Sequence, residues 1–390
     1  MILRALLTTG LLYCFLPLHA QTFDWAAAVQ GGGMARAVAV DAEGNVYSVG
    51  NANAQVDFDP GPGVVLSPPG SGTNGDVYVV KYDNAGNYVW HYVAGNSDTQ
   101  IAKNVVVDGA GDVLVTGYFT SSFDWDPGPN TVQIAGYYDS FVLKLSAAGE
   151  FLWVQHIGGG GEEQCHGLAV DADNNVYVSG SNSDNAIFGN SDTTFANDDG
   201  GAWNGYYAKY SADGNFLWAK SISGSGSQIG HSIACAGDRL YLYGACSGAT
   251  TVNGTHTVTT PAGQISAYLC KTDTAGNVIW LKSQTSTNSV SGEVVRTNGS
   301  NIYLFASFRG TVDADPGDGT LQLVPPSDSY PQTLFAKLDT SGNAVWARQL
   351  QGNVHFDSVG DIALDAAGGV VVTCAIAQTQ DYDPGPGEAI

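Results

Sequence analysis

A repeated acidic motif, Asp-x-Asp-Pro-Gly, is the most specific arrangement of side chains in this chain that could hold a ligand. Its two carboxylates and an exposed carbonyl offer the oxygen ligands that Ca²⁺ accepts. The same residues suit a capped turn, because Asp accepts backbone N–H groups and Pro-Gly makes the bend. We favour the turn, since each copy has fewer ligands than the roughly six to eight that Ca²⁺ takes, and calcium is the alternative. The carboxylates are Asp57 and Asp59, Asp124 and Asp126, Asp313 and Asp315, and Asp381 and Asp383.

A second repeated position lies five residues before the end of a short strand-like run in each unit. If these strands are innermost, their side chains meet at the mouth of a central channel, where basic or titratable groups would attract an anionic ligand. Local pairing of each side chain with an acid or with solvent is the competing interpretation, and we favour it here. Zinc at the two histidines would need a third ligand that the sequence does not show. The position holds Arg36, Lys103, His166, His231, Gly292 and Gly360.

The tryptophans fall into two groups. Six recur at the end of strand-like runs, with spacings of 65, 63, 65, 62 and 66 residues (Trp25, Trp90, Trp153, Trp218, Trp280 and Trp346). Their fixed place among alternating apolar residues predicts packing between repeat units. Trp125 and Trp203 break the pattern, and we predict that they are exposed aromatic contacts for a ligand.

Catalytic signatures are missing from the sequence. It contains no G-x-S-x-G elbow, no H-E-x-x-H helix and no phosphate loop. We therefore expect no enzymatic activity. A polysaccharide-active hydrolase or lyase is the alternative, because a carboxylate pair is not visible as such in a sequence. The third unit departs from the repeat at residues 181–205, which is where such a site would be sought.

A strand–turn–strand hairpin at residues 76–93 organises the chain. Its strands are rich in β-branched and aromatic residues, and Gly86 supplies the positive φ that its turn needs. The hairpin recurs at residues 141–154, 206–220, 268–282 and 334–348, and each copy follows a pair of short strands. We label the four strands of a unit a to d, with a innermost.

Four strands repeated at a fixed period predict an all-β fold, a β-propeller with six or seven blades of about 64 residues. The last blade is expected to be truncated, since the sixth unit ends after its first two strands. Residues 22–29 resemble strand d alone and are expected to close the ring with the C-terminal strands. An open solenoid is the structural alternative.

The run D-x-x-G-N-V-Y-x-x-G … D-x-D-P-G-x-G … F-V-x-K-x-D-x-x-G-N-x-x-W resembles the SBBP-type β-propeller repeat of secreted bacterial proteins. The resemblance covers nearly all of residues 22–390. It implies a propeller fold and export, and many such proteins are cargo of the type IX secretion system with a C-terminal sorting domain. It brings no established catalytic residues.

The N-terminus and the composition indicate an exported protein. Arg4, an apolar run at residues 5–18 and Leu18-His19-Ala20 resemble a signal peptide at 1–20, which leaves the repeats at 21–390. No second long apolar run exists, so no membrane span is expected. The net charge of -23 argues against nucleic acid and anionic membranes. We expect a monomer, secreted or at the cell surface, that binds an extracellular protein or glycan.

The cysteines predict neither a disulfide framework nor a zinc site. Cys14 would leave with the signal peptide, and the remaining five are widely spaced and mostly in strand-like runs. Small buried hydrophobes are the favoured interpretation, with a Cys246–Cys270 bridge left open.

Loop lengths distinguish the two faces of the predicted propeller. The a–b and c–d turns are short throughout and would form one face. The b–c and d–a connections are longer and would lie together on the opposite face. Loops on a rigid scaffold commonly bind ligands, so we predict that the opposite face is the working surface.

Overall fold

The secondary structure of the chain consists of repeated four-stranded antiparallel units. The computed structural model describes residues 30–68, 75–189, 194–195, 202–326, 330–350, 361–364 and 370–372. These ranges contain strands, turns and bends and no helix. None of the described residues therefore belongs to a helix able to cross a bilayer. The strands of each unit lie side by side in the order a, b, c, d, as the hairpin pattern predicts.

All four strands are described in five such units, here called blades 1 to 5. Blade 1 contains β1 (Gln30–Val40), β2 (Val46–Asp57), β3 (Asp76–Tyr82) and β4 (Tyr88–Ala94), and blade 2 contains β5 (Gln100–Val107), β6 (Val113–Phe119), β9 (Asp139–Leu145) and β10 (Phe151–Gly159). Blade 3 contains β11 (Glu163–Val170), β12 (Val176–Asn182), β15 (Asn204–Tyr210) and β16 (Phe216–Gly224). Blade 4 contains β17 (Gln228–Ala236), β18 (Arg239–Cys246), β21 (Ser266–Asp273) and β22 (Val278–Gln284), and blade 5 contains β23 (Ser289–Thr297), β24 (Asn301–Arg309), β27 (Gln332–Asp339) and β28 (Ala344–Leu350).

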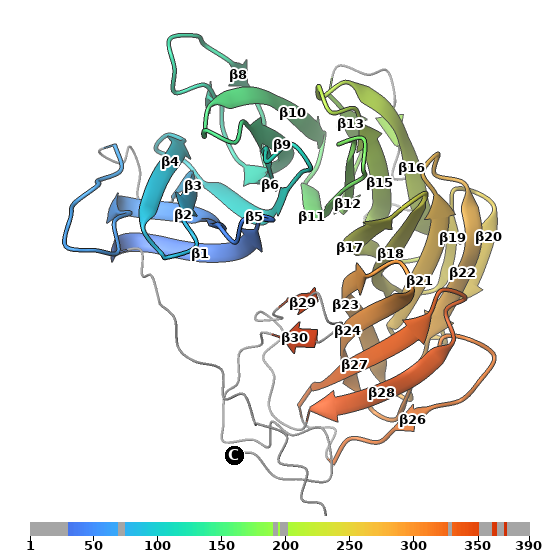
Figure 1. Ribbon diagram of the computed structural model, residues 1–390. Helices are drawn as coiled ribbons and strands as arrows, with labels where there is room; N and C mark the ends of the chain where they lie inside the picture. Colours follow the sequence, from blue (N-terminus) through green and yellow to red (C-terminus); the bar gives the residue numbers. More distant parts are fainter. Residues whose placement is uncertain are drawn as a thin grey trace, which may run out of the picture.

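The blades follow one another around a common centre, with strands a on the inside (Figure 1). A further pair, β29 (Ile362–Leu364) and β30 (Val370–Val372), lies against β23 and occupies the position of strands a and b of a sixth unit. The fold is therefore a propeller-like repeat. No strand pairing within the described ranges joins blade 1 to blade 5, so ring closure and the number of blades stay predictions. Residues 22–29, which were expected to close the ring, lie outside the described residues.

The tight turns form as the sequence predicts. In the c–d turn of blade 1, one Asp83 carboxylate oxygen accepts the N–H groups of Ala85 and Asn87 at 2.9 and 2.8 Å. Gly86 has φ 83°, a conformation that costs other residues free energy. Asp41 caps the a–b turn of the same blade in the same way. The a–b and c–d turns together form what we call the tight-turn face.

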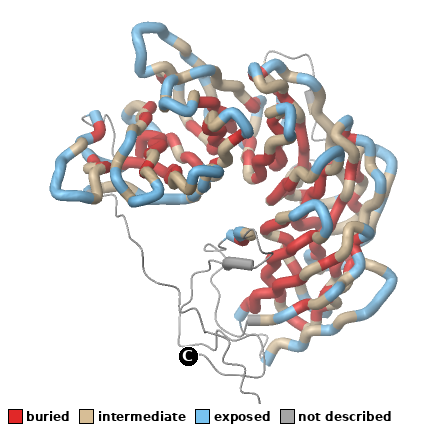
Figure 2. The backbone as a smooth tube through the Cα atoms, in the orientation of Figure 1, coloured by how far each residue is buried: buried red, intermediate tan, exposed pale blue. Residues whose placement is uncertain are grey.

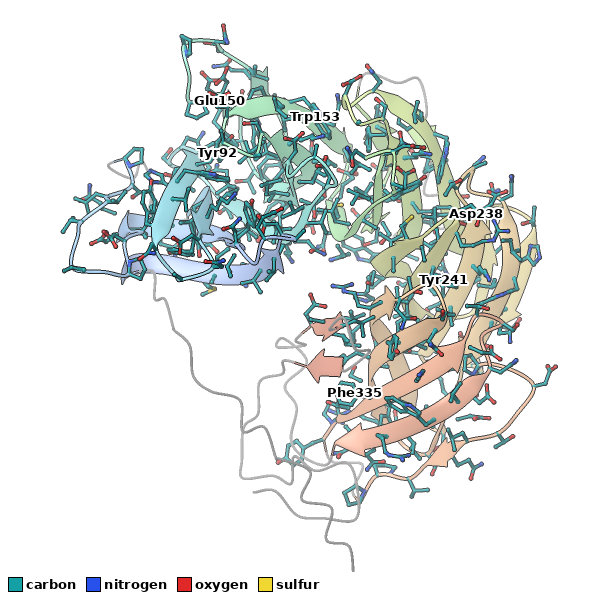
Figure 3. The ribbon with its side chains drawn as sticks, viewed as in Figure 1. Tyr92, Glu150, Trp153, Asp238, Tyr241 and Phe335 are labelled. Atoms are coloured by element: carbon teal, nitrogen blue, oxygen red, sulfur yellow. The ribbon has the colours of Figure 1, made fainter. Side chains whose placement is uncertain are left out.

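The strand-d tryptophans join successive blades, as predicted. Trp90 donates its indole N–H to the Ala147 carbonyl at 3.1 Å, in the c–d turn of blade 2. Trp153 makes the same 3.1 Å bond to Ala212 in blade 3, and it lies on the side of blade 2 that faces that blade (Figure 3). A Cβ atom on Gly149 would come within 2.6 Å of the Trp90 ring. Each tryptophan therefore packs on a glycine of the next turn.

The b–c connections contradict the prediction that they lie on the face opposite the tight turns. They fold back as small hairpins along the outer edge of the propeller, and in two blades they pair with strand d of the preceding blade, β13 with β10 and β19 with β16. The physical reason is that strand d presents unpaired N–H and C=O groups, which the hairpin satisfies. These hairpins are β7 (Phe123–Asp124) with β8 (Gln133–Ile134), β13 (Ala186–Phe188) with β14 (Thr194–Phe195), β19 (Ala249–Val252) with β20 (His256–Thr259), and β25 (Val312–Asp313) with β26 (Gln322–Leu323).

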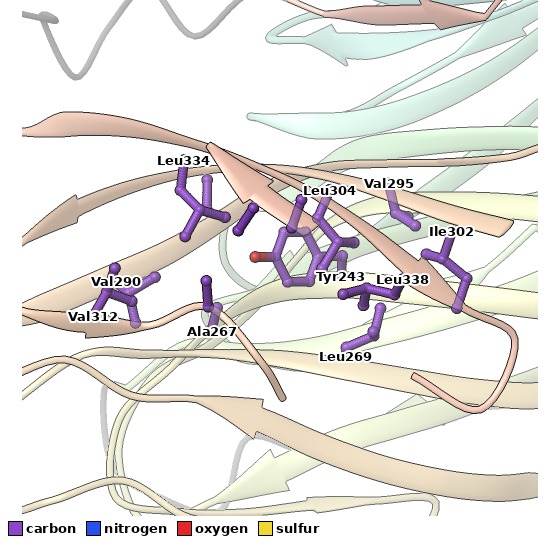
Figure 4. Close-up of a cluster of buried hydrophobic side chains, with 14 of the residues drawn as sticks. Tyr243, Ala267, Leu269, Val290, Val295, Ile302, Leu304, Val312, Leu334 and Leu338 are labelled. Atoms are coloured by element: carbon purple, nitrogen blue, oxygen red, sulfur yellow. The ribbon is translucent and has the colours of Figure 1, made fainter. Parts of the chain in front are cut away.

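Buried residues follow the strands of all five blades (Figure 2). Figure 4 shows one cluster in which Tyr243 and Leu269 of blade 4 pack with Leu304 and Leu338 of blade 5. Blades thus share cores with their neighbours, as expected of repeats that cannot bury an apolar face alone.

Three of the described cysteines, Cys165, Cys246 and Cys270, are buried as small apolar side chains in these cores, while Cys14 and Cys374 lie outside the described residues. Cys246 and Cys270 are both buried and both free, so the bridge left open between them does not form. The strand register gives the reason: Cys270 is opposite Leu242, and Cys246 is opposite Ser266.

Candidate functional site

The second repeated position is a β-bulge in strand a of all five described blades. In β1, for example, the pairing with β2 shifts between Ala35 and Ala37, so Arg36 is the extra residue. A bulge changes the direction of a side chain relative to the regular ladder. The register shifts place Lys103, His166 and His231 at the same position in blades 2 to 4.

In blade 5 the structure corrects the predicted residue. The bulge holds Glu293, between Gly292 and Val294, and not Gly292. Counting back from the strand end failed because the a–b turn of this blade begins one residue later, at Asn298, whose N–H bonds to the Asn301 carbonyl. Gly360 lies outside the described residues.

The five bulge side chains line one cavity of about 360 Å³ in the central channel. This volume lies within the range of about 300–1,000 Å³ typical of small-molecule sites. We call Arg36, Lys103, His166, His231 and Glu293 the bulge ring. Arg296 and Asp361 line the same cavity. The structure therefore brings together the four basic or titratable residues that the sequence singled out, and adds one acid.

Local pairing accounts for only part of the bulge ring. His231 Nδ1 lies 3.8 Å from a Glu293 carboxylate oxygen, whose partner oxygen accepts a bond from Ser307 at 3.1 Å. Arg36 bonds to the Asn51 side chain at 3.4 Å, and Lys103 Nζ lies 5.4 Å from the centre of the Tyr118 ring. Neither cation forms an ion pair in the part of the chain that the structure describes. Two positive groups thus face the cavity without a bound counter-charge.

The electrostatics of the ring favour an incoming negative charge. Burial, with His231 and Lys103 nearby, lowers the pKa of His166 well below its usual range. Burial also lowers the pKa of His231, an effect that Glu293 opposes and Lys103 reinforces. The imidazole rings lie 5.4 Å apart and tilt by 35°. Burial and the Arg36 charge lower the pKa of Lys103. An anion in the cavity would relieve the charge repulsion that contributes to these shifts.

A second cavity of about 500 Å³ continues the channel toward the tight-turn face. It is lined by strands a of the five blades and by β29, with apolar side chains such as Val38, Val40, Val106 and Val170. The two cavities share Val38, Asn104, Arg296 and Asp361. The channel therefore has a charged half at the bulges and an apolar half beyond them.

Arg296 and Asp361 form an ion pair at the junction of the two halves. The guanidinium Nη2 lies 2.6 and 2.8 Å from the two Asp361 oxygens and links β23 to the segment leading into β29. The sequence contained a signal for this residue that the reasoning missed: the equivalent positions hold Ala39, Val106, Ala169 and Ala234.

The Asp-x-Asp-Pro-Gly motifs form the same capped turn in each described copy. Asp57 Oδ1 accepts the N–H groups of Asp59 and Val65 at 3.1 and 2.8 Å, and Asp59 Oδ1 accepts that of Gly61 at 2.7 Å. Asp124 with Asp126, and Asp313 with Asp315, repeat these bonds within 0.1 Å.

This geometry favours the turn over the calcium interpretation. One oxygen of each carboxylate is engaged by backbone donors. In the described ranges no three His, Cys, Asp or Glu side chains gather as a metal-ligand set. The copy at Asp381 and Asp383 lies outside those ranges. The turn in blade 5 also contacts its own c–d turn, since Asp315 accepts the N–H of Ala344 at 3.0 Å.

Trp125 is not an exposed contact, so that prediction is wrong. Its side chain has 0% exposure and lies between the rings of Phe123 and Phe141, at centroid distances of 4.3 and 4.6 Å. The cause is the folded-back hairpin, which presses the central residue of the motif into the blade edge. Phe58 and Ala314 occupy the same place and are equally buried. Trp203 is half-buried, and its carbonyl accepts the N–H of Gln228 at 2.7 Å.

A buried carboxyl pair between blades 2 and 3 escaped the sequence reasoning. Glu163 is fully buried beside Asp139, and Asp139 Oδ2 lies 2.5 Å from His156 Nε2. Burial, with Asp139 nearby, raises the pKa of Glu163 to about 8. The signal was a Glu at the first position of strand a, where Gln100 and Gln228 stand in blades 2 and 4. Since no part of Glu163 reaches solvent, this pair is not an accessible site.

Comparisons with known proteins support a repeat propeller and assign no activity. No protein-family model matches the chain. It is similar to an uncharacterized WD repeat-containing protein of Acanthamoeba polyphaga mimivirus, with 27% identity over 53% of this chain and 17% of that protein. It is also similar to the regulatory protein FlaEY of Caulobacter vibrioides, with 29% identity over 45% of this chain and 18% of that protein. The chain thus spans less than a fifth of the length of these curated relatives.

One solved structure, a protein of unknown function from Bacteroides caccae, is similar over 77% of this chain and 79% of that one. Its identity is 11% and its TM-score 0.39, too low to support an argument. WD repeats are four-stranded propeller blades, so the first relative agrees with the blade architecture described above.

Proposed function

We propose that this chain is an exported, non-enzymatic binding module, a propeller of the SBBP type, whose central channel holds a small anion. The observation that supports this most strongly is the convergence of Arg36, Lys103, His166 and His231 on one cavity. The cations among them have no acidic partner in the described part of the chain. The chain has a net charge of -23, so most of its surface would repel anions, and the positive cavity would attract them.

The rigidity of the scaffold supports binding rather than catalysis. Each bulge is held by ladder pairs on both sides, so the ring needs little ordering when a ligand arrives. Ser232, a hydroxyl in the cavity wall, accepts the N–H of Val295 at 3.2 Å and serves the contact between blades 4 and 5. Its oxygen also accepts a bond from Arg296 Nη1 at 3.4 Å, and among the described residues it bonds to no histidine or carboxylate that would activate it as a nucleophile.

Export and a place outside the cell belong to this proposal. They rest on the signal-like residues 1–20 and on the resemblance to secreted SBBP-type repeats, many of which are type IX secretion cargo. An extracellular protein or glycan that presents an acidic group is the partner that fits the channel. Calcium in the acidic turns is not part of the proposal, because backbone N–H groups already engage one oxygen of each carboxylate there.

A polysaccharide-active enzyme is the alternative. Asp198 and Asp199, in the divergent part of blade 3, lie outside the described residues. Turnover of a glycan substrate that is lost in Asp198→Asn or Asp199→Asn would replace our proposal with this one.

Calorimetric titration of the purified protein with sodium sulfate at about pH 6 tests the binding site. We expect binding that weakens at least about tenfold in Lys103→Ala, because one charge-assisted contact is lost. Lys337→Ala is the matched control, since Lys337 Nζ also lies over a tyrosine ring, 5.7 Å from that of Tyr303, but outside the cavity. No binding, or equal losses in the two variants, would contradict the proposal.

A further inference from the structure

We propose that the channel ligand is an amphiphilic anion, a single carboxylate joined to an apolar chain, and this inference rests on the proposed anion site. The two halves of the channel are continuous, because both cavities are lined by Val38, Asn104, Arg296 and Asp361. One molecule can therefore contact the bulge ring and the apolar half at the same time.

The charged half fits one anionic group and no more. Arg36 and Lys103, from neighbouring blades 1 and 2, offer the positive charge without an acidic partner. On the opposite side of the ring, Glu293 and the ion-paired Asp361 carry negative charge into the same cavity. A second anionic group elsewhere on the ligand would meet these carboxylates, so a ligand with one anionic group is favoured over one with several.

The histidines complete the head-group site. His166 and His231 are held neutral near pH 7 by the low pKa values described above, and a neutral imidazole can donate one hydrogen bond. Both follow Lys103 around the ring, on β11 and β17. They can therefore donate to a carboxylate without adding a fixed charge.

The apolar half offers surface that a hydrocarbon chain would cover. Val38 and Val40 are 63% and 61% exposed, although they lie on an inner strand. Across the cavity are Val106, Val170 and Ala234. Two polar groups also line this half. Arg296 is already paired with Asp361. Burial raises the pKa of the Cys235 thiol to about 11, so the thiol stays uncharged. Covering these side chains would remove apolar surface from water on both ligand and protein.

Two kinds of molecule have this chemistry. A medium-chain fatty acid and the C-terminus of an apolar peptide each carry one carboxylate next to hydrocarbon. Octanoate is the probe for the first class and N-acetyl-leucyl-leucine for the second. Acetate shares the head group without the chain, and octanol shares the chain without the charge.

Calorimetry with these four compounds at about pH 6 tests the inference. We expect octanoate or the dipeptide to bind at least about tenfold more tightly than acetate, from the added apolar contact. We expect octanol to bind at least about tenfold more weakly than octanoate. Val40→Asn, at a valine that lines the apolar cavity and not the charged one, should weaken the amphiphile about fivefold and leave acetate unchanged. Val345→Asn, at a 58% exposed valine of the outer strand β28, should change neither.

The failures are distinguishable. If acetate binds as tightly as both longer compounds, the amphiphile inference is wrong and the anion site stands. If octanol matches octanoate, the carboxylate contributes nothing to binding of the longer compounds and the amphiphile inference is wrong, while sulfate binding still decides the proposed function. If no compound and no sulfate binds, both are wrong. Equal effects of Val40→Asn and Val345→Asn would place the apolar contact outside the channel and overturn the inference.

Discussion

The outer acidic turns and the inner bulge ring are both repeated features, yet they differ in what their side chains do. In the turns the residue types are nearly constant, and each first Asp accepts two backbone N–H groups. In the ring the position is constant and the residue type changes from Arg to Lys, His and Glu. The constant residues cap turns in blades 1, 2 and 5, while the variable residues of all five blades face a shared cavity.

The comparison separates two kinds of repetition, recurrence of a residue type and recurrence of a position, and only the second indicates a functional site here. An Asp that recurs because a turn requires it already uses its carboxylate to accept backbone N–H groups. The bulge position recurs with different residue types, so the fold does not require one particular side chain there. Where such positions converge, the protein can present a set of unlike groups to a ligand. The predictions below test this distinction, beginning with the largest expected effect.

Removal of one turn cap should destabilise the fold and leave the channel intact. Asp313→Ala would leave the N–H groups of Asp315 and Leu321 without their acceptor, at a cost of about 3 kcal/mol in unfolding free energy. Urea denaturation measures the loss. Asp318→Ala, at an exposed residue of the same loop, is the control and should change stability by less than about 0.5 kcal/mol. Equal losses in the two variants would mean that the cap contributes nothing.

Glu163 tests whether variation at a repeated position is sufficient to indicate a site. Its pKa in the folded state is about 8, against 4.5 for the free group, so the unfolded chain loses this proton first as pH rises. Stability linked to Glu163 is therefore complete below about pH 4.5 and falls up to about pH 8. Glu163→Gln should raise unfolding free energy at pH 8 by about 2 kcal/mol and have no such effect at pH 4.

Urea denaturation at pH 4 and at pH 8 measures these changes in unfolding free energy. Gln228→Glu is the reverse substitution, at the fully buried blade 4 position equivalent to Glu163. That variant should lose stability as pH rises. A pH-independent gain in Glu163→Gln would contradict the buried-carboxyl explanation. Sulfate affinity should be unchanged, because Glu163 does not line the channel cavity.

Loss of both cations of the bulge ring should reduce ligand affinity and leave stability unchanged, the opposite of the result expected for Asp313→Ala. The double variant Arg36→Ala with Lys103→Ala should weaken sulfate binding more than about tenfold, by about 1.4 kcal/mol or more. Its unfolding free energy should change by less than about 0.5 kcal/mol, because both residues are exposed to the channel and unpaired. A large loss of stability with unchanged affinity would reverse the roles assigned to the two regions.

The smallest effect is expected for calcium. If the acidic turns are capped by backbone N–H groups alone, melting temperatures with excess calcium and with a chelator should agree within about 1 °C. A rise of several degrees in calcium would show that the turns bind the ion and would weaken the contrast with the ring.

Local signals explain why much of this fold was predictable. The hairpins, the capped turns at Asp83 and Asp41, and the Trp90 contact with the next blade all follow from residues near one another or from the period. Convergence of the ring followed from the same period, because equivalent residues of a rotational repeat must meet.

The remaining features depend on contacts between blades that no local pattern encodes. Trp125 is buried because its hairpin folds back onto aromatic rings of its own blade, and its carbonyl accepts the hydroxyl of Tyr92 from blade 1. Glu293 was missed because one a–b turn starts a residue later. The Arg296–Asp361 pair joins residues 65 positions apart. In each case a strand edge or a shifted turn, rather than residue type, determines the outcome.

The most direct test of the account is the histidine titration of the protein by NMR, with and without sulfate. The account predicts that sulfate raises the pKa of both His166 and His231, because a bound anion stabilises the protonated rings. It predicts no change for His91, which is stacked on Phe58 at 4.7 Å in blade 1 and lies outside the cavity. Unchanged pKa values for His166 and His231 in saturating sulfate would contradict the claim that the bulge ring is an anion site.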